Sequence, residues 1–174
     1  RQMCIRDRYS NRPIQRAMPT RVPQFYSLYL LLTTGLIGMT ITGDAFNLYV
    51  LIEITSISCY ALIAKGDDRS ALASFNYLII GTVGACFYLL GAGYLYIMTG
   101  SLNMLDISTL LSKVYGTNAI VAAFSFFMVG IAIKMAFFPL HGWLPNAYTH
   151  SPDVVSAFMA ATCLLYTSPR PRDS

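Results

Sequence analysis

Residues 130–148 read GIAIKMAFFPLHGWLPNAY, a segment that combines apolar, charged and helix-breaking residues. An apolar run of helical length carries Lys134 and is then interrupted by Pro139 and again by Pro145. Proline lacks a backbone donor and clashes with the carbonyl four residues before it, so it breaks a helix. The segment therefore predicts an interrupted helix with a cation beside the break.

The composition around this segment is that of a membrane protein. Of 174 residues, 55% are hydrophobic and only 11% are charged, whereas soluble domains carry about 25% charged residues. Several apolar runs approach about 20 residues, the length that crosses a bilayer as a helix. A soluble core would need helices that are apolar on every side, and the chain has too little polar sequence to cover them.

The two ends differ from the middle and resemble translated sequencing-adapter sequence. The adapter reading TGT CTC TTA TAC ACA TCT encodes Cys-Leu-Leu-Tyr-Thr-Ser, which stands at 163–168, and its complement encodes Met-Cys-Ile-Arg-Asp, which stands at 3–7. Arg170 departs from the serine that the adapter would give. A basic juxtamembrane tail at each end is the alternative interpretation.

We therefore interpret 1–8 and 163–174 as adapter-derived and 9–162 as protein. The two ends together contribute +3 of the formal net charge of +4, so the net charge is no evidence for a nucleic-acid partner. Cys59 and Cys86 lie inside apolar runs and are interpreted as core residues, not as a disulfide or a metal pair.

The middle of the chain divides into long apolar segments that are expected to be helices. Only helices and closed barrels satisfy the backbone in lipid, and these runs are about twice the length of barrel strands and lack their alternation. Ser151-Pro152-Asp153 predicts the cap and first turn of a further, fifth helix. The segments cover about 24–42, 45–64, 71–98 and 118–147, and the last is the interrupted one.

Two further patterns concern helix packing and orientation. Small residues at helix-packing spacing predict close helix contacts. The loop cations lie mostly on one side, which the positive-inside rule assigns to the cytoplasm, with Lys113 opposite. The small residues are Gly35, Gly38, Gly81, Gly84, Ala85 and Gly91, and the cytoplasmic cations are Arg12, Arg16, Arg21, Lys65 and Arg69.

Glu53 lies near the middle of the second segment, where a charge costs about 2.5–3.5 kcal/mol on insertion scales. Such groups face the bundle interior and usually have a function, and proton handling is the favoured one. The alternative is a protonated glutamic acid that hydrogen-bonds a neighbouring helix, with Thr55, Ser56 and Ser58 as the nearby hydroxyls.

Lys134 and His141 each allow two interpretations. If the fourth helix ends near Phe138, Lys134 extends to the membrane surface. If the segment continues through the break, Lys134 lies at a water-accessible site inside the membrane, where lysine can load and release a proton. His141 either relays protons or braces the break through a hydrogen bond. His150 lies in a polar loop and is expected to be solvated.

The segment KMAFFPLHGWLPNAYTHSPDVVSA, 134–157, resembles a pattern of the proton-conducting, antiporter-like membrane subunits. That pattern is K-x-x-x-x-P-L-H-x-W-L-P-x-A followed by A-P-x-x-V-S-A. The family includes the large membrane subunits of respiratory complex I and the D-type subunits of Mrp cation/proton antiporters. Glu53 within its apolar segment and the turn Thr-Gly-Ser-Leu-Asn at 99–103 add to the resemblance.

The resemblance implies an all-α, fourteen-helix, multi-pass subunit of the inner (plasma) membrane, of which this chain matches about helices four to eight. It implies that Glu53 and Lys134 form a charge pair for proton translocation, with His141 nearby, and that Pro139, Trp143 and Pro145 shape the broken helix and its cavity. It implies no cofactor and no metal in this chain. The implied partners are the lipid bilayer, other membrane subunits, protons and Na⁺ or K⁺.

Two departures from the pattern bear on the subtype. Many members carry Lys-Tyr-Phe where this chain has Asn76-Tyr77-Leu78, and complex I subunits commonly have Asp-Ala-His where Asn146-Ala147-Tyr148 stands. Both favour an Mrp-like or related stand-alone transporter subunit. The family's next relay lysine or histidine would follow Thr162, where the adapter-like sequence begins.

Three functions are compatible with these features. The first is cation/proton antiport, as a D-type subunit of an Mrp Na⁺/H⁺ antiporter. The second is proton pumping within a complex I-type NADH:quinone oxidoreductase or a related hydrogenase, where other subunits carry the redox chemistry. The third is a non-conducting structural subunit in which Glu53 and Lys134 only fix packing.

Overall fold

The structure is a computed structural model of the chain, and it describes residues 22–66, 69–114 and 116–160. The described part contains helices and no strand. The ends interpreted as adapter-derived lie outside the described residues. The helices are α2 (Val22–Ile41), α3 (Ala45–Ile63), α4 (Ser70–Thr99), α5 (Met104–Val114), α6 (Asn118–Lys134), α7 (Trp143–His150) and α8 (Asp153–Met159).

Three of these helices, α2, α3 and α4, are long and apolar enough to cross a membrane. They contain 20, 19 and 30 residues, and 20 residues of helix reach about 30 Å. Large apolar side chains such as Leu30, Ile41 and Ile97 are exposed on their outer faces, as expected where lipid covers the bundle. The first three predicted segments are therefore confirmed as helices.

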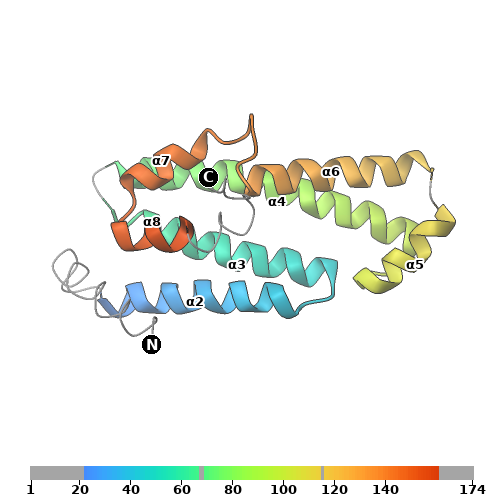
Figure 1. Cartoon of the computed structure of the whole chain (residues 1–174), viewed down its shortest axis with the longest axis horizontal. Helices are drawn as coiled ribbons and strands as arrows, with labels where there is room; N and C mark the ends of the chain where they lie inside the picture. Colours follow the sequence, from blue (N-terminus) through green and yellow to red (C-terminus); the bar gives the residue numbers. More distant parts are fainter. Residues whose placement is uncertain (1–21, 67–68, 115, 161–174) are drawn as a thin grey trace, which may run out of the picture.

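The turn between α2 and α3 is held by side-chain caps. A carboxylate oxygen of Asp44 accepts a hydrogen bond of 2.8 Å from the backbone N–H of Asn47, and the Asn47 amide donates to the Thr42 hydroxyl at 3.0 Å. An N-cap of this kind satisfies a donor that the first helical turn leaves free. The two helices consequently run antiparallel, side by side (Figure 1).

The polar link after residue 99 contains a helix that the sequence analysis did not predict. α5 begins where the Asn103 side chain accepts from the N–H of Leu105 at 2.9 Å. Its apolar residues, among them Ile107 and Leu111, pack on a buried cluster that includes Leu95 of α4. The signal in the sequence is the helical spacing of Ile107, Leu111 and Val114, which places all three on one face. α5 lies at the end of the bundle away from α7 and α8 (Figure 1).

Glycines set the close approach of α4 and α6, which pack against each other more extensively than any other pair of helices in the described chain. A Cβ added at Gly130 would lie 2.8 Å from the carbonyl oxygen of Gly84. A Cβ at Gly91 would likewise meet Phe127 at 2.9 Å. The predicted packing role of the small residues in the third segment is thus confirmed.

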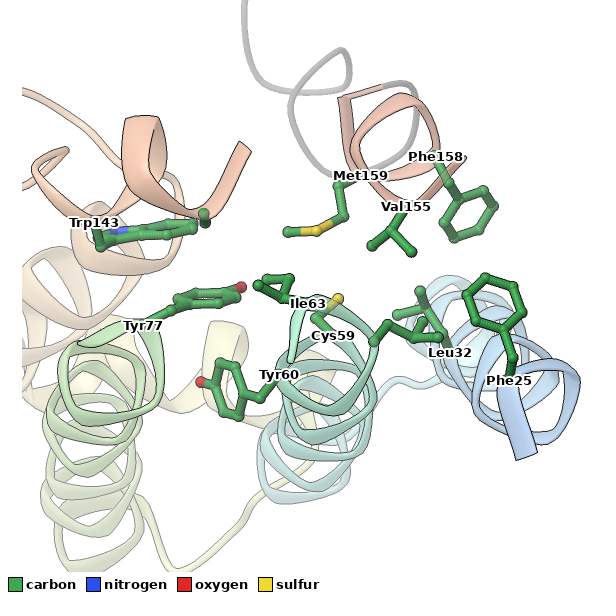
Figure 2. Close-up of a cluster of buried hydrophobic side chains, with 12 residues drawn as sticks. Phe25, Leu32, Cys59, Tyr60, Ile63, Tyr77, Trp143, Val155, Phe158 and Met159 are labelled. Atoms are coloured by element: carbon green, nitrogen blue, oxygen red, sulfur yellow. The ribbon is translucent and has the colours of Figure 1, made fainter. Parts of the chain in front are cut away.

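A buried core joins α2, α3, α4, α7 and α8, as Figure 2 shows. The Trp143 and Tyr77 rings lie parallel with their centroids 4.0 Å apart, and Tyr60 meets Tyr77 edge to face at 4.6 Å. Val155 and Met159 bring α8 onto the same core. This packing holds the short helices α7 and α8 against the long ones.

The fourth segment is interrupted, as predicted, but the break begins earlier than expected. α6 ends at Lys134, and Ala136 has a left-handed φ of 51°. A helix through Pro139 would clash at Met135, so the helical path ends there. α6 and α7 lie end to end along one side of the bundle, with the break near the middle of its length (Figure 1).

Two local predictions need correction. Pro145 does not break a helix, because it lies in the first turn of α7, where a backbone N–H would have no partner within the helix. Ser151 is not the cap of α8. Pro152 occupies that position, and its carbonyl accepts from the N–H groups of Val155 and Ser156 at 2.8 and 3.0 Å. The Ser151 hydroxyl instead bonds to that of Ser156.

Candidate proton-transfer site

The break in the fourth segment brings Lys134 against the middle of α3. The Lys134 Nζ lies 3.3 Å from an Oε1 of Glu53, and the two side chains are 17% and 20% exposed. Lys134 is the last residue of α6, and its long side chain reaches across to α3. Each charge thereby partly offsets the cost of placing the other in an apolar bundle.

Ser56 is the second partner of the lysine. Its Oγ accepts a hydrogen bond of 2.8 Å from Lys134 Nζ. Thr55, Ser56 and Ser58 are the hydroxyls that the alternative of a protonated Glu53 would use, and their own hydrogen bonds go elsewhere. Each of these hydroxyls donates to a carbonyl of its own helix, one turn back, at 2.7–3.1 Å. The spacing of Glu53 and Ser56, three residues apart on one helix face, was the available signal.

A cavity of about 620 Å³ adjoins Lys134 and Ser56, whereas Glu53 is not among the residues that line it. It lies among α2, α3, α4 and α6, and it extends from Lys134 and Ser56 to Met39 and Thr40, near the turn between α2 and α3. Most of its lining is apolar, so the lysine is one of its few polar groups. The polar side chains on its wall include Thr40, Tyr49, Ser56, Tyr77, Tyr88 and Lys134.

The other residues predicted to shape the site lie around the break and not on this cavity. The Trp143 indole N–H donates to the carbonyl of Ile133 at 3.2 Å, and so ties α7 to the last turn of α6. Pro139 lies in the connection between the two helices, and Pro145 is exposed in α7. Trp143 therefore stabilises the break by a contact that sequence reasoning did not identify.

His141 lies in the connection between α6 and α7, and its side chain is exposed. Its ring lies 5.7 Å from that of Phe138, centroid to centroid. The structure does not bring it to Glu53 and Lys134, and within the described residues its imidazole makes no hydrogen bond that would brace the break. Its role in proton relay stays a prediction.

The described residues offer no group of three or more histidine, cysteine, aspartate or glutamate side chains placed to hold a metal ion. An ammonium, a carboxylate and a hydroxyl beside a cavity can hold and transfer a proton.

The sequence of the chain matches the model of a described family. The model of the NADH:quinone oxidoreductase/Mrp antiporter transmembrane family matches residues 42–167. The chain belongs to this family. The resemblance seen in the sequence is therefore confirmed, and the chain is a multi-pass membrane protein.

Relatives of the family come from both kinds of complex. The chain is 54% identical over 153 residues to NADH-quinone oxidoreductase subunit N of Desulforudis audaxviator, covering 88% of this chain and 30% of that protein. It is 34% identical over 134 residues to the D subunit of the Na⁺/H⁺ antiporter of Alkalihalophilus pseudofirmus, covering 76% of this chain and 27% of that protein.

A solved relative has the same helix arrangement. The membrane-bound sulfane sulfur reductase, an archaeal respiratory membrane complex, contains a chain that matches with a TM-score of 0.75 and 36% identity. The match covers 79% of this chain and 28% of that one. The chain thus spans less than a third of the length of the relatives that it matches in this family.

Proposed function

We propose that this chain is part of a membrane subunit that translocates protons, with Lys134 as the group that loads and releases the proton. The observation that carries the proposal is the contact of Lys134 Nζ with Glu53 Oε1, 3.3 Å across two helices. An ionisable pair inside an apolar bundle is costly and marks a functional site.

In this proposal the distance between Glu53 and Lys134 sets the proton affinity of the lysine. While the carboxylate is close, it stabilises the ammonium form. When the two groups separate, the ammonium loses that partner and gives up its proton to the adjoining cavity. The break after Lys134 supports the mechanism, because non-helical backbone at membrane depth is tolerated beside water-filled space. His141 is proposed as a further relay residue.

We propose that proton movement is driven by redox chemistry in other subunits of a complex I-type assembly. This is supported by the 54% identity to a subunit N. In such an assembly the chain carries no redox group itself, and its partners are the lipid bilayer and other membrane subunits.

The second candidate is exchange of Na⁺ or K⁺ for protons, as a D-type antiporter subunit. It is supported by the 34% identity to the D subunit of an antiporter. It is also supported by Asn146-Ala147-Tyr148, where complex I subunits commonly have Asp-Ala-His, and by Asn76-Tyr77-Leu78, where many family members have Lys-Tyr-Phe.

The experiment places Lys134→Ala in the complete subunit, in inverted membrane vesicles. Loss of NADH-driven proton uptake supports the redox-driven assembly, whereas loss of proton release on adding Na⁺ or K⁺ supports antiport. Assembled subunit is quantified in each preparation. A variant that assembles and transports like the wild type in both assays would overturn the proposal in favour of a structural subunit.

A further inference from the structure

The shorter of the two polar contacts of Lys134 is to Ser56 and not to Glu53. The Nζ–Oγ distance is 2.8 Å, while the Nζ–Oε1 distance is 3.3 Å. Ser56 is buried, and it lines the cavity beside Lys134. The lysine is thus held at the cavity wall by a contact that does not depend on the carboxylate.

The hydroxyl proton of Ser56 is already used. Its Oγ donates to the carbonyl of Ile52 at 2.7 Å. A hydroxyl has one proton to donate and two lone pairs that accept, so toward Lys134 it acts as an acceptor. Hydrogen bonds from a charged donor are about twice as strong as neutral ones, and the contact therefore favours the protonated lysine.

We infer that Ser56 is a positioning residue for proton transfer, which holds the Lys134 ammonium at the cavity wall when Glu53 moves away. The inference rests on the proposed function, because it assigns Ser56 a role only if Lys134 carries protons. It predicts that Ser56 affects both the rate of proton transport and the pH range over which Lys134 takes up its proton.

Other titratable groups face the same site and must be kept unchanged in the test. α4 contributes Tyr77 and Tyr88 to the cavity wall, and the described part of α2 contributes Thr40 but no titratable side chain. The titratable side chains that α3 contributes near the site are Glu53, Tyr49, Cys59 and Tyr60.

The chain offers a matched control in Ser58. It is buried in the same helix, and its hydroxyl donates to the carbonyl one turn back at 2.8 Å, as that of Ser56 does. Lys134 makes its hydrogen bonds to Glu53 and Ser56 and none to Ser58. Ser58→Ala therefore removes a similar hydroxyl without touching the lysine.

The experiment compares Ser56→Ala, Ser56→Thr, Ser58→Ala and Lys134→Ala in the complete subunit within its complex. Proton transport in inverted vesicles is measured against pH and normalised to assembled subunit. Ser56→Ala is expected to slow transport about tenfold and to move the pH profile about one unit toward acid, because the ammonium has lost an acceptor. Ser56→Thr is expected to restore both, and Ser58→Ala to change neither.

The outcomes separate this inference from the proposed function. If Lys134→Ala abolishes transport but Ser56→Ala keeps the wild-type pH profile, the inference is overturned and the proposed function stands. If Lys134→Ala transports normally, both are overturned. Should Ser56→Ala fail to assemble, Ser56→Cys replaces it, since a thiol is a weak acceptor of similar size. A cysteine variant with the wild-type profile would again overturn the inference.

Discussion

The Nζ of Lys134 lies 3.3 Å from Oε1 of Glu53, although 81 residues separate the two in the chain. The contact exists because α6 ends at Lys134 and α3 passes that end at its midpoint.

Replacing Glu53 with Gln removes the charge but keeps the size of the side chain. Lys134 then keeps the Ser56 hydroxyl as an acceptor but faces a neutral amide in place of the carboxylate. Breaking one side of a buried ion pair costs about 3–5 kcal/mol, so transport is expected to fall at least about tenfold. Proton uptake by vesicles measures this. Asp106→Asn, at an exposed carboxylate of α5, is the control, and equal rates for the two variants would refute the prediction.

Lys134→Arg separates charge from proton exchange. Arginine keeps the positive charge and its donors toward Glu53, but it stays protonated in proteins. The variant is expected to assemble in normal amount and to transport no protons. Lys134→Met, which removes the charge as well, is expected to reduce assembly too. Quantifying assembled subunit beside the transport rate tests this, and an arginine variant that transports would contradict it.

Trp143 is expected to stabilise the broken helix through two separable contacts. Trp143→Phe removes the N–H that bonds to Ile133, at a cost of about 1 kcal/mol. Trp143→Ala also removes the stacking on Tyr77, at a cost of about 3–5 kcal/mol. The unfolding midpoint of the purified subunit in detergent measures both. Equal midpoints for the two variants would show that the stacking contributes nothing.

Gly130→Ala tests the approach of α6 to α4. The added methyl would lie 2.8 Å from the Gly84 carbonyl, so the helices must move apart, and we expect a loss of about 1–3 kcal/mol. Gly93→Ala is the matched control, because nothing lies within 4 Å of its added methyl. Alanine favours helix there by up to about 1 kcal/mol. Equal thermal stabilities of the Gly130→Ala and Gly93→Ala variants would contradict the close packing of α6 on α4.

The orientation of the bundle is testable by cysteine labelling. Lys65→Cys and Ser112→Cys lie near opposite ends of the spanning helices. In a background without Cys59 and Cys86, a membrane-impermeant maleimide applied to intact cells is expected to label position 112 and not position 65, because the positive-inside rule assigns position 65 to the cytoplasm. The reverse pattern would invert the predicted topology.

The sequence predicted the spanning helices well because each is decided locally, by a long apolar run that ends at a turn or a polar loop. The same reasoning missed α5, although Ile107 and Leu111 are four residues apart and so lie on one helix face, which packs near Leu95. It also assigned a break to Pro145, which tertiary structure places in the first turn of α7. For Pro145 the deciding fact is where α7 begins after the break, and the local pattern does not give that position.

From the order of residues alone, one could determine the membrane class, the interrupted fourth segment and the two intramembrane charges, Glu53 and Lys134. These follow from local composition and from what proline and charge cost in an apolar helix. Only the tertiary structure decided that Lys134 meets Ser56 as well as Glu53, and that a cavity adjoins Lys134 and Ser56. The reason is geometric: which side chains meet across helices depends on how α3, α4 and α6 pack, and the close contact of Gly84 with Gly130 sets that packing.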